Sequence, residues 1–174
     1  MSDAGFALLD DRAILAVSGA DRRSFLQGLV SNDVEKVGPA QARYAALLTA
    51  QGKYLHDFMM IEFDEAIWLE AEAGRLSDLK RRLSIYRLRA KAALDERPEL
   101  AVAVVFGASA LAAMDLSEEP GAARPFGSGV AFVDPRLAAL GVRCILPSMD
   151  IRPALEGIGL AESGFPAHDR RRVT

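Results

Sequence analysis

Three apolar segments separated by short polar turns lie within residues 43–72, and they constrain the fold more than any other feature of the sequence. The segments read "RYAALLT", "YLHDFMMIEF" and "AIWLEAE". The letters "AQGK" separate the first two, and "DE" separates the second from the third. Short polar turns between apolar strands are typical of antiparallel neighbours. The sequence therefore predicts an antiparallel meander.

The segments before the meander predict strands and one helix. "FALLDDRAILAVSG" holds two apolar runs around an acidic pair, which predicts a hairpin that turns at residues 10–11. "SGADRRSFLQGLVSNDV" then predicts a short helix that buries Phe25 and Leu26, with Ser18 or Asp21 as its cap. We expect this helix to end near Asn32.

The segments after the meander continue the mixture of helices and strands. "GRLSDLKRRLSIY" spaces Leu76, Leu79, Leu83 and Tyr86 as an amphipathic helix that lies on the sheet. "RLRAKAALDER" alternates like a strand with one basic face. "ELAVAVVFG", "VAFVDP" and "VRCILP" predict strands, "ASALAAMDL" predicts a helix, and a helical segment is expected over residues 148–157.

This order of elements indicates an α+β fold and not a doubly wound parallel sheet. "SEEPGAARPFGSG" is rich in Pro and Gly, so it marks a loop or a boundary. We predict an α+β core over residues 1–120 and a second α+β subdomain over residues 121–174. The final "SGFPAHDRRRVT" has no closing apolar element, which indicates either that the second subdomain is truncated or that this is a frayed natural terminus.

Composition narrows the functional classes. The chain has 174 residues, of which 51% are hydrophobic and 26% are charged, which is typical of a globular protein. Its net charge of -3 provides no general attraction for nucleic acid or an anionic membrane, so neither is an expected partner. With a single cysteine and neither a leader nor a long apolar run, the sequence predicts a cytoplasmic protein.

Several standard chemistries lack their residues. The sequence has no phosphate-binding loop, no Cys-x-x-Cys pair, no His-Glu-x-x-His motif and no nucleophile elbow. His56, His168 and Cys144 are scattered along the chain, so we expect no metal site.

Three local features each allow a structural or a functional interpretation. His56 and Asp57 point to opposite faces of a strand, so they are not expected to form a hydrogen-bonded dyad. His56 is either a solvated or hydrogen-bonded histidine at the end of the strand, or a ligand contact. The basic residues within 87–91 either decorate an exposed face or bind a carboxylate-rich ligand. "SNDV" is either a helix cap or a ligand-positioning loop.

Four segments together resemble a known family. "FLQGLVSNDV", "YAALLTAQGKYLHDFMMIEF", "LKRRLSIYRLRAKAAL" and "FVDPRLAALGVR" resemble the amino-terminal part of the YgfZ-type folate-binding proteins. These proteins are relatives of the glycine-cleavage T-protein, an aminomethyltransferase, and they assist iron-sulfur cluster assembly and repair. The resemblance extends from about Phe6 to Arg143. It implies a T-protein-like fold that binds tetrahydrofolate or a derivative.

The resemblance also implies where a folate would bind. The T-protein turn carries an Asp that contacts folate and orients the transfer chemistry, and His56 occupies that place here. A histidine cannot replace a fixed negative charge beside a developing iminium. We therefore expect folate binding that depends on His56 more than on His168, without catalytic residues. The candidate contacts are Asn32, Asp33, Tyr44, Thr49, Gln51, Lys53, His56, Arg87, Arg89 and Lys91.

A second departure concerns the family's cysteine. Its Lys-Gly-Cys-[Tyr or Phe]-x-Gly-Gln-Glu motif is absent, and Cys144 in "VRCILP" has the apolar surroundings of a buried, unactivated thiol. The sequence thus favours a non-catalytic folate-binding protein that supports iron-sulfur cluster assembly or repair, with assembly or client proteins as partners. The alternatives are a folate-dependent aminomethyltransferase and a protein-binding scaffold that does not bind folate.

Overall fold

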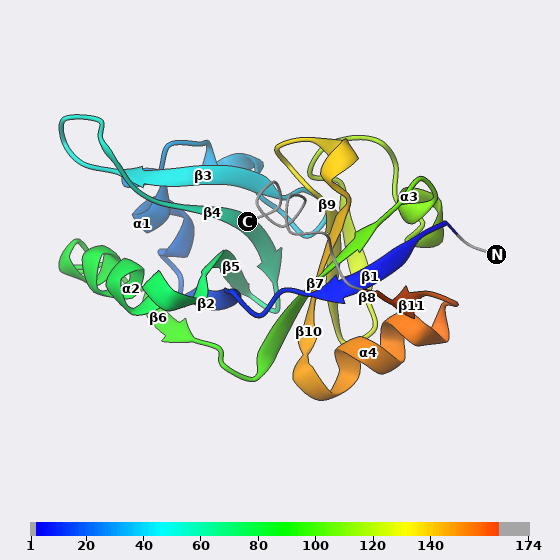
Figure 1. The fold of residues 1–174 in the computed structure, drawn as a ribbon. Coiled ribbons are helices and arrows are strands. Elements are labelled where there is room, and N and C mark those ends of the chain that lie inside the picture. Colours follow the sequence, from blue (N-terminus) through cyan, green and yellow to red (C-terminus); the bar gives the residue numbers. More distant parts are fainter. Residues whose placement is uncertain (1–2, 164–174) are drawn as a thin grey trace.

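Two β-sheets pack face to face, and helices cover their outer faces (Figure 1). The computed structural model describes residues 3–163. Sheet B has the strand order β3-β4-β5-β2-β6, and sheet A has the order β11-β1-β7-β10-β9-β8. The strands of sheet B are β2 (Arg12–Ser18), β3 (Arg43–Leu48), β4 (Tyr54–Phe63), β5 (Ala66–Glu72) and β6 (Ala93–Glu96). Those of sheet A are β1 (Gly5–Leu8), β7 (Leu100–Phe106), β8 (Ala123–Phe126), β9 (Gly129–Val133), β10 (Val142–Pro147) and β11 (Ala161–Glu162).

Seven short or medium helices accompany the sheets in the described part of the chain. The α-helices are α1 (Arg22–Gln27), α2 (Leu76–Ile85), α3 (Ala110–Ala113) and α4 (Ser148–Gly157). The 3-10 helices are η1 (Val34–Lys36), η2 (Ala73–Arg75) and η3 (Ala138–Leu140). Over the described residues, every helix is too short or too polar to span a bilayer.

The predicted meander is confirmed. β3, β4 and β5 pair antiparallel in sequence order, and Gly52, with φ of +84°, supplies the left-handed residue in the turn between β3 and β4. Sheet A is antiparallel except where β1 pairs with β11. The two mostly antiparallel sheets with few helices confirm the predicted α+β class.

The predicted hairpin over "FALLDDRAILAVSG" is wrong, although its turn is placed correctly. β1 pairs with β7 and β11 in sheet A, whereas β2 pairs with β5 and β6 in sheet B. The acidic pair therefore carries the chain from one sheet to the other. Alternation of apolar residues indicates a strand but does not identify its partner, because both strands would bury an apolar face in either arrangement.

The predicted strand over "RLRAKAALDER", residues 87–97, is also wrong in its first part. Only Ala93–Glu96 form β6, and the preceding residues form a turn in which Ala90 N–H donates to the Arg87 carbonyl. α2 ends at Ile85, so Tyr86 lies outside the helix and is exposed, contrary to its predicted place on the buried face. The expected helix near residue 110 spans four residues, and the Pro- and Gly-rich loop contains β8.

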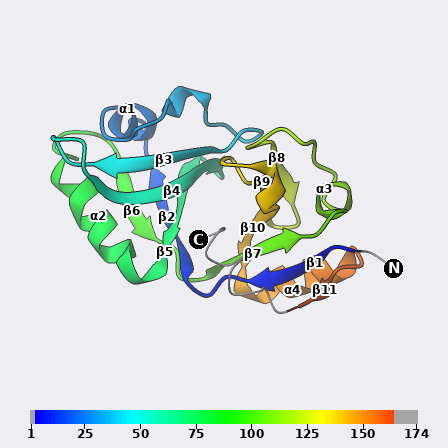
Figure 2. The same cartoon turned by 45° about the horizontal axis from the view of Figure 1, so that its top comes forward.

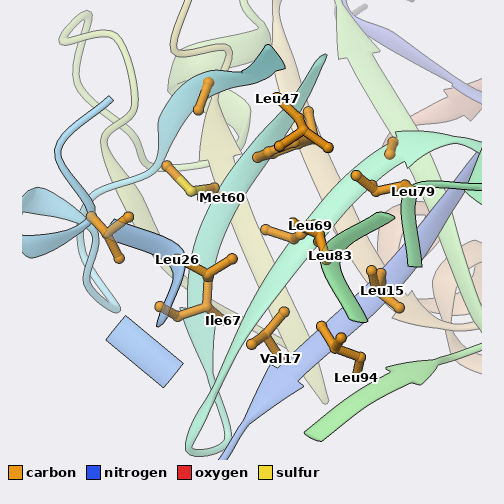
Figure 3. Close-up of a cluster of buried hydrophobic side chains, with 14 of the residues drawn as sticks. Leu15, Val17, Leu26, Leu47, Met60, Ile67, Leu69, Leu79, Leu83 and Leu94 are labelled. Atoms are coloured by element: carbon orange, nitrogen blue, oxygen red, sulfur yellow. The ribbon is translucent and has the colours of Figure 1, made fainter. Parts of the chain in front are cut away.

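Apolar side chains fill the space between the sheets and the space under the helices. Ile14, Trp68 and Phe132 belong to the cluster between the sheets. On the outer face of sheet B, Leu79 and Leu83 of α2 pack with leucines of β2 and β5 (Figure 3). Burial of each such side chain contributes about 1.5–3 kcal/mol to folding. A third cluster joins α3 and α4 to the outer face of sheet A.

The predicted boundary at residues 120 and 121 stays a prediction. β7 lies before it and β10 after it, and these two strands pair along their length in sheet A. Sheet A therefore contains strands from both sides of this position.

Candidate functional site

A groove of about 690 Å³ lies where the beginning of β3 meets the segments around β8 and β9. Figure 2 shows the first residues of β3 approaching this part of sheet A, and Gln41 pairs with Ala122 there. The lining residues are Asn32, Gln41, Ala42, Arg43, Tyr44, Glu119, Pro120, Pro135 and Arg136. We call this cavity the seam groove. It brings together two of the predicted contacts, Asn32 and Tyr44.

Tyr44 connects the seam groove to a carboxylate. Its hydroxyl donates to Oδ2 of Asp57, and the Tyr54 hydroxyl donates to Oδ1 of the same carboxylate at 2.9 Å. Burial, the hydrogen bond and the negative charge of Asp57 raise the pKa of Tyr44 to about 12. At neutral pH the site therefore presents a protonated phenol beside a carboxylate that accepts two hydrogen bonds.

Arg136 places a cation on the other side of Tyr44. Its guanidinium is 5.8 Å from the centre of the Tyr44 ring, and its Nη2 donates to Oδ2 of Asp134 at 2.7 Å. Burial disfavours the charged form, but the bonds to Asp134 and the charge of Glu70 outweigh it and raise the pKa of Arg136. Asp134 and Arg136 come from "DPR" at the end of β9.

A buried ionic cluster joins the two sheets beside this groove. Glu70 of β5 accepts from Arg12 of β2 in the same sheet and from Arg143 of β10 in the opposite sheet. Nη1 of Arg143 lies 2.8 Å and 2.9 Å from the two carboxylate oxygens. All three side chains are at least 95% buried. Two guanidiniums share one carboxylate, so the cluster has an excess positive charge.

His56 lies on the opposite face of β4 from the seam groove. Its side chain is 4% exposed, and Nε2 lies 2.8 Å from Oδ2 of Asp78 on α2. The prediction that His56 and Asp57 point to opposite faces is confirmed. The assignment of the folate contact to His56 stays a prediction. Asp57, its neighbour, is the residue whose carboxylate faces Tyr44 and the groove side of β4.

Asn32 and Asp33 shape the loop before η1. Nδ2 of Asn32 donates to the Tyr44 carbonyl at 2.8 Å, which fixes this loop against β3. Asp33 is the N-cap of η1 and accepts from the Glu35 N–H at 3.0 Å. The capping interpretation of "SNDV" is confirmed for Asp33, while Asn32 also lines the groove.

The remaining predicted contacts lie elsewhere. Thr49, Gln51 and Lys53 form the turn between β3 and β4, at the other end of β3 from the seam groove, and Thr49 Oγ1 accepts from the Lys53 N–H. A different turn, after α2, contains the exposed Arg87, Arg89 and Lys91. The structure does not bring either turn together with Tyr44.

Sequence reasoning missed Asp57 and Arg136 as members of the site. Alternation along β4 places Asp57 on the same face as Met59 and Ile61, but only the structure shows that this face meets the other sheet. "DPR" directly after a buried strand was the signal for Arg136. By contrast, nothing in the sequence indicates that Glu70 and Arg143 meet.

Cys144 is fully buried, and burial raises the pKa of its thiol above the usual range, as expected for an unactivated cysteine. Within residues 3–163 there is no group of three His, Cys, Asp or Glu side chains arranged to hold a metal ion. His168 lies outside the described residues.

Comparison with known proteins gives relatives along nearly the whole chain. No family model matches it. The human mitochondrial iron-sulfur cluster assembly factor IBA57 is 33% identical over 94% of this chain and 48% of its own length. This chain is a homologue of the IBA57 and YgfZ family. The mouse IBA57 is 32% identical over 84% of this chain and 44% of its own, so the chain spans about half the length of these relatives.

Solved structures share the fold. The glycine cleavage system aminomethyltransferase T from Bartonella henselae superposes with a TM-score of 0.73 at 19% identity, over 90% of this chain and 45% of that one. The heterotetrameric sarcosine oxidase from Corynebacterium sp. U-96 gives a TM-score of 0.56 at 10% identity, over 94% and 90% of the chains. The resemblance of this IBA57 homologue to the T-protein fold is therefore confirmed.

Proposed function

We propose that this IBA57 homologue is a non-catalytic, folate-binding part of an iron-sulfur cluster assembly factor. The observation that carries the proposal is the 33% identity with human IBA57 over 94% of the chain. Proteins with that name assist iron-sulfur cluster assembly, and assembly or client proteins are accordingly the proposed partners. The relatives are named mitochondrial, and the cytoplasmic location expected from this sequence stays a prediction.

The seam groove is the proposed site for tetrahydrofolate or a derivative. A reduced folate has a flat pterin with hydrogen-bond donors, an aromatic linker and a carboxylate-bearing tail. The residues in and beside the groove match these groups, since Tyr44 offers a ring, Asp57 an acceptor and Arg136 a cation. The carboxylate of Asp57 can still accept further hydrogen bonds, because it has about four acceptor sites.

Calorimetry with tetrahydrofolate tests this proposal. Replacing Arg136 by Gln removes a charge-assisted contact, and we expect binding to weaken by about tenfold. Tyr44→Phe should weaken binding less, since the ring remains. Gln51→Ala, in the remote turn between β3 and β4, is the matched control and should bind like the wild type. If no heat is detected, or if Arg136→Gln binds unchanged, the seam groove is not a folate site.

The same titration separates His56 from Asp57. Asp57→Asn retains the shape of the side chain but removes its charge, and it lies on the groove side of β4. We expect Asp57→Asn to reduce affinity more than His56→Gln, which disturbs the contact with α2. The reverse order would support the sequence-based assignment of the folate contact to His56.

A second candidate function is the folate-dependent aminomethyltransferase. The observation that favours it is Asp57, an acid on the groove side of β4 held by two tyrosine hydroxyls. Glycine-cleavage exchange with this chain in place of the T-protein decides between the two. Folate-dependent turnover that is lost in Asp57→Asn but kept in His56→Ala would replace the non-catalytic proposal.

A further inference from the structure

The end of α2 and the turn after it expose apolar side chains to solvent. Ile85, Tyr86 and Leu88 are 59%, 56% and 88% exposed. Scattered exposed leucines are ordinary on protein surfaces, but three large apolar residues within four positions form a local patch. The side chains contribute little to the core of this chain.

Leu88 is also in an unfavourable backbone conformation. Its φ is +45°, in the left-handed region that residues with a bulky side chain rarely adopt. The other described non-glycine residues with positive φ are the acidic Asp64, Glu65 and Asp115. Asp tolerates this region because its short polar side chain can form hydrogen bonds with nearby groups, whereas the side chain of Leu cannot. Strained residues of this kind are concentrated at functional positions.

A shallow cavity adjoins the exposed turn. It has a volume of about 330 Å³, and Tyr86 forms one side of it. The other lining residues are Gly28, Leu29, Val30, Ser31, Leu47, Leu48, Thr49 and Ala50. Leu48 is 41% exposed, and Tyr86 belongs both to the cavity wall and to the turn after α2, so it connects the two. We call residues 85–91 together with this cavity the α2-end surface.

Exposed cations lie next to Leu88 in the sequence of this surface. Arg87, Arg89 and Lys91 are exposed, and none of their side chains has an acidic partner within residues 3–163. Asp21 binds the backbone N–H of Lys91 and not its ammonium group. The patch is therefore locally positive, although the whole chain has a net charge of -3. A partner that fits it must be acidic.

We propose that the α2-end surface is a docking site for an acidic amphipathic segment of a partner protein. The apolar side of the segment would cover Leu88 and enter the cavity beside Tyr86, while its carboxylates would pair with Arg87, Arg89 and Lys91. The surface lies at the opposite end of β3 from the seam groove. The proposal therefore does not depend on folate binding, and each can fail without the other.

Fluorescence anisotropy with a labelled helical peptide of about 16 residues tests the proposal. The probe has leucines on one helical face and glutamates on the other. We expect it to bind, and added salt should weaken the binding. Three control peptides have the same length: one with the leucines scrambled, one of glutamates alone, and one with lysines for glutamates. No binding of the probe, or equal binding of any control, would overturn the proposal.

A substitution at Leu88 provides the sharpest variant. Leu88→Gly removes the exposed side chain and relieves the left-handed backbone, so we expect a higher melting temperature together with about tenfold weaker peptide binding. Asp115→Gly, at a φ of +53° elsewhere, is the matched control and should leave peptide binding unchanged. Unchanged binding in Leu88→Gly would overturn the proposal. The proposal would also be overturned if sedimentation showed that the wild type forms a dimer and Leu88→Gly does not. The α2-end surface would then bind a second copy of this chain.

Discussion

His56 and Asp57 are neighbours in the sequence with different surroundings. Successive side chains on a strand point to opposite faces, so His56 reaches Asp78 on α2 while Asp57 reaches Tyr44 on the groove side. The sequence predicted this division between faces. It could not predict which face the seam groove lies on, because that depends on how sheet A packs against sheet B.

Tyr44 gives a measurable consequence of the contact with Asp57. Its pKa is raised to about 12 in the fold, above the ordinary value of 10.0, so folding favours the protonated phenol. The resulting stability is fully present below pH 10 and is lost as the pH rises toward 12. We expect Tyr44→Phe to lose less stability than the wild type as the pH rises from about 9 to about 11. This range is centred on the ordinary pKa of tyrosine.

Urea unfolding across that range measures the effect of Tyr44→Phe. Tyr86→Phe is the control, since Tyr86 is an exposed tyrosine outside the seam groove. The assignment would be wrong if both variants followed the same alkaline profile as the wild type.

α2 illustrates what periodicity predicts and where it fails. Leu76, Leu79 and Leu83 are buried as their spacing predicts, because a helical stripe of leucines can pack on a sheet in only one rotation. The alternation that follows predicted a strand, but Arg87 and Arg89 lie in a turn. Alternation is informative only where one face is buried, and the left-handed Leu88 ends any extended run.

Asp78 connects α2 to β4 and should make this connection sensitive to acid. Hydrogen bonds from Arg82, His56 and Arg81 lower the pKa of Asp78 below its ordinary value of 3.8. The stability from the ionised form is thus present above that value and is lost as the pH falls through the lowered pKa. We expect Asp78→Asn to be less stable than the wild type at about pH 6. This difference in stability should shrink below about pH 3, which is lower than the ordinary pKa of Asp.

Thermal unfolding over this pH range provides the measurement for Asp78. Asp64→Asn, in the exposed turn between β4 and β5, is the control and should match the wild type throughout. A constant difference between wild type and Asp78→Asn at every pH would show that the ionic contacts do not contribute.

At the scale of the whole molecule, the ionic cluster joins the two sheets next to the apolar cluster that fills the space between them. Glu70→Gln leaves the guanidiniums of Arg12 and Arg143 buried without a full countercharge. Breaking a buried ion pair in this way costs about 3–5 kcal/mol. We expect a loss of this size in urea unfolding, followed by Trp68 fluorescence and by circular dichroism.

The control for Glu70→Gln is Glu72→Gln on the same strand, because Glu72 is exposed. It should change stability by less than about 0.5 kcal/mol. The cluster would be structurally unimportant if the two variants had equal unfolding free energies.

The sequence thus predicted most elements and the fold class, but only part of the site. Asn32 and Tyr44 were recognised through family resemblance, and both line the seam groove. Arg136 was not recognised, and neither was the contact between Glu70 and Arg143. These residues reach their partners only after the two sheets pack. Local patterns determine which residues are buried, whereas contacts between distant strands depend on the topology.

The division of the strands between the sheets has a consequence for how the chain folds. Sheet B is built from the continuous stretch of residues 12–96, while residues 5–8 of sheet A must find residues 100–106. Pairing across such a long loop has a larger entropic cost and is slower than pairing neighbours. During synthesis on the ribosome, β1 therefore waits without its partner until β7 emerges, and sheet B can form first and serve as the surface on which sheet A assembles.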